Sequence, residues 1–264
     1  MNRKCRVTFL FAVLLVALVT GHAFAALPFL TEDAETLGKG TSQVELWYEG
    51  FSDRGTVAGS EVKSVSNLPG ATFGHGIAER LDLTLGFLRL WGEDTVDGVR
   101  ASDAGSAAFT LSAKWNVFEK REFYVAVKPL AGYSYRIGGA ADDHATSFGG
   151  WLIATREHEG LAVSLNAGYL FNDYGSAAER DSSRKSIWSL SALVTYEILD
   201  GLILGLDLVT YTHPDKAQSG VPAFANAGAI FSPAKKIDLS LGFKIGLTEP
   251  APDFAGIAGV TFRF

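Results

Sequence analysis

Few residues of this chain have the types and spacing that catalysis requires. A serine nucleophile needs a neighbouring histidine and a polar group that orients the imidazole. The nearest candidates are His144 and Ser147, but residues three apart in a strand point to opposite faces of the sheet. The sequence shows no phosphate-binding loop, histidine-rich metal motif or haem motif. We therefore expect no enzyme activity, no cofactor and no protein metal site. Ca²⁺ or Mg²⁺ held by acidic loop residues such as Asp142 and Asp143 is a minor alternative.

Charged side chains at alternate positions of otherwise apolar segments are the other candidates for a function. Six are acidic and four are basic: Glu45, Glu49, Asp82, Glu197, Asp207 and Asp238, with Lys114, Lys128, Lys244 and Arg263. In a closed barrel they would share the inner face and either line a path for solutes or fill the interior with ion pairs, because narrow barrels fill themselves with side chains. Since both signs of charge are present, we expect no strong ion selectivity.

The composition is unusual for a soluble enzyme. The chain of 264 residues is 47% hydrophobic, with a net charge of −6 and a mean hydropathy of +0.16. Such a composition excludes a disordered chain, and the acidic balance argues against nucleic acid as a partner. Residues 1–25 are a predicted signal peptide, because basic residues precede the apolar run Phe9–Val19 and the small-x-small site Ala23–Ala25. Cleavage would also remove Cys5, the single cysteine, so no disulfide is expected.

Alternation of apolar and polar residues is the dominant pattern of the remaining chain. From Ile237 to Leu247 every odd position is apolar and every even position is polar or glycine. A period of two with one apolar face indicates half-exposed strands. Twelve such segments are predicted, at 42–51, 62–76, 81–91, 105–118, 122–135, 146–156, 161–172, 185–198, 202–212, 221–231, 236–248 and 254–264.

The connections between these segments alternate in length. Those after the second, fourth, sixth, eighth and tenth segments are short, whereas others, such as 91–104, 137–145 and 172–184, are longer and rich in Gly, Ser and Asp. This alternation is typical of bacterial outer-membrane barrels, which must close because hydrocarbon cannot pair backbone amides. Residues 42–264 therefore predict a single all-β domain, an up-and-down antiparallel barrel of twelve strands. Aromatic residues near segment ends, Trp47 and Tyr48 among them, predict the girdles at the membrane surfaces.

Both ends of the exported chain resemble known outer-membrane proteins. Phe262 and Phe264 end the last alternating segment, which resembles the signature read by the barrel assembly machinery. Residues 27–40, LPFLTEDAETLGKG, resemble the opening of the "putative MetA-pathway of phenol degradation" family, and 76–83, 113–115, 166–169 and 246–264 resemble its later elements. The chain departs from the family at Glu32, where Asp is usual, and at 135–138, which replace a Pro-Thr-Gly. This resemblance implies an outer-membrane barrel and at most a channel for small, often hydrophobic, compounds.

The function expected from these observations is passive exchange of small molecules across the bacterial outer membrane, through the lumen or a lateral opening. Residues 26–41 precede the first strand and are interpreted either as a plug folded into the lumen or as a disordered periplasmic leader. The main alternative is a closed structural barrel whose outer loops bind lipopolysaccharide or partners, and a lipid hydrolase is a minor one. The expected partners are the outer membrane and its lipopolysaccharide, the assembly machinery and a small-molecule permeant.

Overall fold

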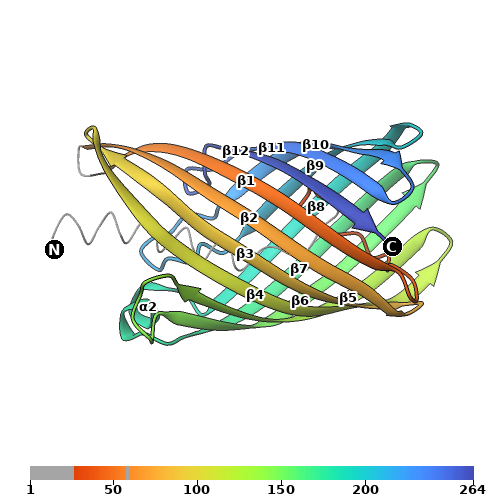
Figure 1. The fold of residues 1–264 in the computed structure, drawn as a ribbon, viewed down its shortest axis with the longest axis horizontal. Helices are drawn as coiled ribbons and strands as arrows, with labels where there is room; N and C mark the ends of the chain where they lie inside the picture. Colours follow the sequence, from red (N-terminus) through yellow and green to blue (C-terminus); the bar gives the residue numbers. More distant parts are fainter. Residues whose placement is uncertain (1–26, 58–59) are drawn as a thin grey trace.

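The computed structural model describes residues 27–57 and 60–264, which form a closed antiparallel barrel of twelve strands and one short helix (Figure 1). The predicted signal peptide lies outside the described residues. The elements are β1 Ser42–Val57, β2 Ser60–Ala78, β3 Leu81–Val96, β4 Val99–Lys120, β5 Phe123–Arg136, β6 His144–His158, β7 Leu161–Tyr174, α2 Ala177–Ser182, β8 Ser186–Leu199, β9 Leu202–Tyr211, β10 Ala223–Ala234, β11 Ile237–Gly246 and β12 Phe254–Arg263. Within the described residues, no helix has the length and apolar character that crossing a membrane demands.

The barrel closes where the first strand meets the last. β1 pairs with β12 from Gln43 opposite Arg263 to Ser52 opposite Phe254. The Ser42 amide donates to the Phe264 carbonyl at 2.8 Å, and the Phe264 amide donates back at 2.9 Å. Every strand therefore has two paired neighbours, and the sheet has no open edge.

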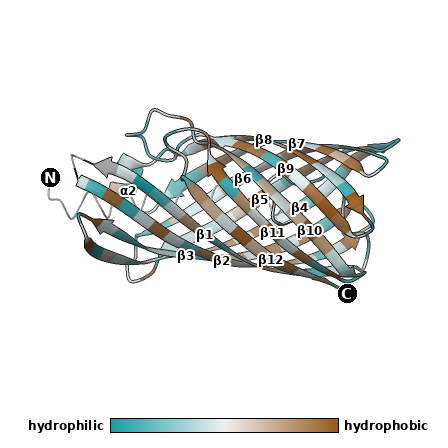
Figure 2. Ribbon diagram, turned by 90° about the horizontal axis from the view of Figure 1, so that it is seen from above, coloured by the Kyte–Doolittle hydropathy of each residue, from teal (hydrophilic) through white to brown (hydrophobic). Residues whose placement is uncertain are grey.

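Alternate residues of each strand face opposite sides of the wall. In β11 the odd residues are largely exposed, with Leu241 68% exposed, whereas Asp238 and Lys244 on the even positions are buried. Figure 2 shows hydrophobic and hydrophilic residues alternating along the strands. The apolar face thus points outward, as a membrane requires, and the polar face points inward. The fold predicted from the sequence is confirmed.

The two ends of the barrel differ in their connections. At one end, called the turn end, two-residue turns join β2 to β3, β4 to β5, β6 to β7, β8 to β9 and β10 to β11. The other end, called the loop end, carries the longer connections, including the one that holds α2. The helix begins after Ser176, whose side chain accepts a hydrogen bond from the Glu179 amide.

Two predicted connections at the loop end are wrong: most of 52–61 belongs to β1 and β2, and the stretch between the third and fourth segments is also mainly strand. Most of 91–104 belongs to strands, because β3 continues to Val96 and β4 begins at Val99. Asp97 and Gly98 alone form the turn, both with positive φ, as tight hairpin turns require. The polar composition of this stretch had suggested a loop. A paired hairpin beyond the membrane remains stable in water, however, so polar residues there do not end the strands.

Candidate functional site

Residues 27–41, called the inner segment here, lie inside the barrel. Near its beginning, the Pro28 carbonyl accepts a hydrogen bond from Asn226 Nδ2 on β10 at 2.8 Å. Near its end, the Leu37 amide donates to Asp82 on β3 at 2.9 Å. The segment therefore crosses the interior from the wall at β10 to the wall at β3 before the chain enters β1.

Three glycines in the wall make room for the beginning of the inner segment. Gly228 on β10 pairs with Gly205 on β9 and with Gly242 on β11, so the three form one row across neighbouring strands. A Cβ atom on Gly228 would collide with the Pro28 ring, one on Gly205 would collide with the Phe29 ring, and one on Gly242 would lie 2.9 Å from Pro28 Cβ. The row is therefore a groove that fits Pro28 and Phe29, and we call it the glycine groove.

Two lysines of the wall form ion pairs with acids of the inner segment. Lys128 on β5 pairs with Glu32, and both side chains are almost fully buried. Lys114 on β4 lies 3.5 Å from an Asp33 carboxylate oxygen. Because an isolated buried charge is costly, the Lys128–Glu32 pair fixes the segment to the wall, and the partly exposed Lys114–Asp33 pair adds a second contact.

Asp207 on β9 holds the segment through hydrogen bonds. Its carboxylate accepts from the Leu30 amide at 2.7 Å, from the Thr31 amide at 3.2 Å and from the Thr31 hydroxyl. Four residues predicted to line the lumen, Asp82, Lys114, Lys128 and Asp207, are thus placed against the inner segment.

Three further candidates have partners on the wall itself. Glu45 accepts a hydrogen bond from the Thr72 hydroxyl on β2 at 2.8 Å. Glu49 on β1 forms an ion pair with Lys244 on β11, and both side chains are buried. The Glu49–Lys244 pair therefore joins two strands that are distant in the sequence, whereas Glu45 is held by a neutral hydroxyl of the neighbouring strand.

The last three candidates lie near the turn end. Arg263 pairs with Asp238. Glu197 is exposed, and its carboxylate accepts a hydrogen bond from the Gly201 amide at 3.1 Å in the turn between β8 and β9. The structure does not bring Glu197 together with Lys114 and Lys244, the two residues expected to line a channel with it.

Glu35 lies on the inner segment near further acids. Desolvation, reinforced by the negative charges of Asp33 and Glu157, raises the pKa of Glu35 to about 7. Its side chain still reaches solvent. Part of the Glu35 population is therefore protonated at neutral pH.

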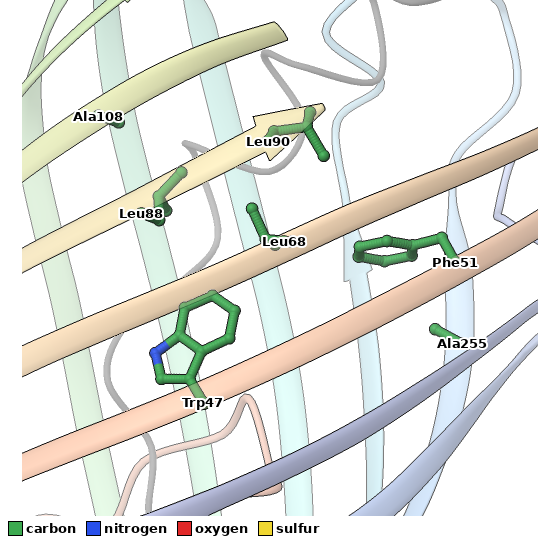
Figure 3. Packing of buried hydrophobic residues seen from close by; sticks show 7 residues of the cluster. All are labelled: Trp47, Phe51, Leu68, Leu88, Leu90, Ala108 and Ala255. Carbon is green, nitrogen blue, oxygen red and sulfur yellow. The ribbon is translucent and has the colours of Figure 1, made fainter. Parts of the chain in front are cut away.

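An apolar cluster covers another part of the inner face (Figure 3). We call it the apolar wall, and it consists of Trp47, Phe51, Leu68, Leu88, Leu90, Ala108 and Ala255. The prediction that Trp47 lies in a membrane-surface girdle is wrong, because its side chain is buried on the inner face, as is that of Phe51. The neighbouring Tyr48 is exposed on the outer face. Gly70 on β2 makes space for the indole, since a Cβ there would collide with it.

The sequence analysis missed the residues that fit the inner segment into the wall. Gly205, Gly228 and Gly242 look like ordinary strand glycines until the pairing places them in one row. Asn226 was missed because a neutral amide carries no charge signal. A possible signal was the inward position of the three glycines, each of which alternates with apolar outward residues.

The residues considered for catalysis do not form a serine–histidine pair. The Ser147 hydroxyl is buried and donates to Asn172 Oδ1 at 2.6 Å. His144 stacks on Tyr133, with ring centroids 5.7 Å apart. Among residues 27–57 and 60–264, no three His, Cys, Asp or Glu side chains gather as ligands for a metal ion.

Comparison with known proteins points to one family. The family model described as "Putative MetA-pathway of phenol degradation" matches residues 48–264. No curated protein matches the chain.

Solved structures of outer-membrane proteins share the fold. The COG4313 outer membrane channel from Pseudomonas putida F1 has a TM-score of 0.66 at 16% identity, covering 88% of this chain and 98% of that one. The translocator domain of the autotransporter NalP from Neisseria meningitidis has a TM-score of 0.57 at 13% identity, covering 99% and 97%. The KdgM porin has a TM-score of 0.52 at 12% identity, covering 84% and 99%. At such identities the likeness concerns the fold.

Proposed function

The chain belongs to the "Putative MetA-pathway of phenol degradation" family of outer-membrane barrels, and on this premise we propose that it is a passive channel for small molecules which the inner segment closes. The family resemblance implies small, often hydrophobic, permeants. In this proposal residues 27–41 act as a plug, and opening requires that they leave the glycine groove.

The observation that carries the proposal is that charged side chains of the inner face contact the inner segment. Lys114, Lys128 and Asp207 all bind the inner segment. Backbone pairing between β1 and β12 closes the barrel by itself, so the wall has no need of the segment for closure. Charges that bind a removable segment would become a polar lining once the segment moved.

Single-channel conductance in planar bilayers tests this proposal. The exported chain, residues 26–264, is compared with a chain that lacks residues 26–40, and heat-modifiable migration in gels verifies that both barrels have folded. We expect rare openings from the first and steady openings from the second. If the truncated barrel is folded and silent, the plug proposal is wrong.

A closed structural barrel that binds lipopolysaccharide is the second candidate. It is favoured by hydrogen bonds that hold two of the loops together. The Arg184 guanidinium donates to the carbonyls of His213 at 2.8 Å and Gln218 at 2.9 Å, which joins the connection holding α2 to the connection between β9 and β10. Arg184→Ala should then weaken lipopolysaccharide binding to the folded barrel. Equal binding by this variant and the parent would count against that role.

A further inference from the structure

The wall binds the backbone of the inner segment at several places. From residue 27 to 41 the segment is neither helix nor strand, so its buried N–H and C=O groups depend on partners outside it. Asn226 on β10 donates to the Pro28 carbonyl at 2.8 Å, and Asn116 Nδ2 on β4 donates to the Ala34 carbonyl at 3.2 Å. The Ala34 amide donates to the Thr155 hydroxyl oxygen on β6 at 2.9 Å. Every residue except proline carries the same two backbone groups, so these contacts do not depend on the side chains of the segment.

A third asparagine, Asn166 on β7, binds both backbone groups of one residue. In the amide orientation that satisfies both of its polar atoms, Asn166 accepts from the Glu32 amide at 2.7 Å and donates to the Glu32 carbonyl at 2.9 Å. Its side chain thus pairs with the segment as the backbone of a neighbouring strand would. Asn116, Asn166 and Asn226 come from β4, β7 and β10, so one such amide stands on every third strand in this part of the wall.

Two of these three amides are only half used by the inner segment. The Oδ1 atoms of Asn116 and Asn226 are shielded from solvent and have no hydrogen-bond partner among the residues that the structure describes. Asn116 is 4% exposed and Asn226 is 0% exposed. At Asn226 the cause is Pro28, which has no N–H to donate in return. At Asn116 the Ala34 amide is already bound to Thr155. A buried acceptor without a donor is unfavourable, so the site offers more hydrogen bonds than the segment uses.

The inner segment itself shows the size and charge of what this site accepts. Since the segment fills the site, another peptide of similar length fits there once the segment has left. Lys128 is buried against Glu32, so a replacement needs a carboxylate at the same point. The glycine groove, which holds Pro28 and Phe29, suits a ring or another flat apolar side chain.

We propose that the lumen is a binding site for oligopeptides without secondary structure, that it recognises their backbone amides together with one carboxylate, and that the inner segment occupies it as an intramolecular competitor. The proposal rests on the proposed function, because a peptide enters only when the inner segment leaves. It names a class of ligand for the channel and the side chains that recognise it.

Exchange of the inner segment for a synthetic peptide tests this site. The recognition sequence of a site-specific protease is inserted between Lys39 and Gly40, which are both exposed, so the barrel folds with its whole exported chain and is cut afterwards. The released segment is washed out with dilute urea, and heat-modifiable migration verifies that the barrel is still folded. The probe is the peptide of residues 27–39 with fluorescein on Lys39, and its uptake in detergent is followed by fluorescence polarisation. We expect saturable binding to the cut barrel and far weaker binding to the uncut one, where the tethered segment competes at an effective concentration of about millimolar.

Two pairs of peptides separate recognition of the backbone from recognition of the sequence. An N-methyl group on the Glu32 amide removes the hydrogen bond to Asn166 and should raise the Kd about 3- to 10-fold, the effect of losing one neutral hydrogen bond. An N-methyl group on the Thr36 amide, which bonds to no described residue, is the control. A shuffled peptide that keeps Phe29 and Glu32 in place should displace the probe with a Kd within about tenfold of the parent peptide. A shuffle that also moves Glu32 should not displace it.

Variants of the wall complete the test. Asn166→Leu removes two neutral hydrogen bonds and should raise the Kd of the probe about 5- to 150-fold. Asn67→Leu is the matched control, because Asn67 accepts a hydrogen bond from Tyr48 on the outer face of β2, and it should leave the Kd unchanged. Folded cut barrels that bind no probe, or that bind it equally with Asn166→Leu and with the N-methylated Glu32 peptide, overturn the peptide site.

Conductance of the same preparations is scored separately. Probe binding to a barrel that stays silent after the segment is washed out supports the peptide site and rejects the channel. Openings that appear after washing and that no peptide blocks or binds do the reverse.

Discussion

The substitution Gly228→Ala should open the barrel by pushing the inner segment out of the glycine groove. The added methyl group would collide with the Pro28 ring, and it would also lie 3.1 Å from the Leu241 carbonyl oxygen of the wall and 3.3 Å from Phe29 Cε1. Overpacking of this kind costs about 1–3 kcal/mol. Since every 1.4 kcal/mol is a factor of ten, the ratio of open to closed states should rise about 5- to 150-fold. The assay is the open probability of single channels in planar bilayers.

A matched control is Gly256→Ala on β12, because a Cβ at Gly256 meets nothing within 4 Å. This variant should behave like the parent. In a chain that lacks residues 26–40, Gly228→Ala should change conductance far less, because Pro28 and Phe29 are gone and only the contact with the Leu241 carbonyl oxygen remains. If Gly228→Ala leaves the open probability of the full exported chain at the level of the Gly256→Ala control, then Pro28 and Phe29 do not close the barrel and the reasoning fails.

Three other substitutions and conditions give separate predictions. Lys128→Met removes the partner of the buried Glu32 carboxylate. Because breaking such a pair costs about 3–5 kcal/mol, channel openings should become more frequent in the same bilayer assay. Adding Glu32→Gln to this variant should largely restore closure. The pKa of Glu35 is raised from 4.5 to about 7 in the seated segment, so the seated state binds the extra proton. Closure should therefore be strongest near pH 4.5 and weaken as the pH rises through 7; Glu35→Gln should flatten this dependence, and an unchanged pH profile would contradict the assignment. Leu241→Arg places a charge on the outward face of β11 and should lower the free energy of unfolding in lipid vesicles by about 2–4 kcal/mol. Denaturant titration measures this change, and an unchanged midpoint would contradict the outward position of Leu241.

The strands were predictable from the sequence because their signal is local. Each strand must present apolar residues to lipid at every second position, so Leu239, Leu241 and Phe243 mark β11 without knowledge of its neighbours. The signal weakens outside the membrane, where water permits polar residues on both faces. For this reason the sequence failed between 91 and 104, where β3 and β4 extend to the turn at Asp97.

The inner segment was only partly predictable because its contacts join residues that are far apart in the chain. From the sequence, residues 26–41 could be described as a plug or as a disordered leader, and the family resemblance favoured a contact with the lumen or its rim. Asn226 contacts Pro28 across 198 residues, and the glycine groove exists only after β9, β10 and β11 have paired. Alternation places a side chain on the inner face, but it does not reveal which inner residues meet. That information comes from the closure of the barrel.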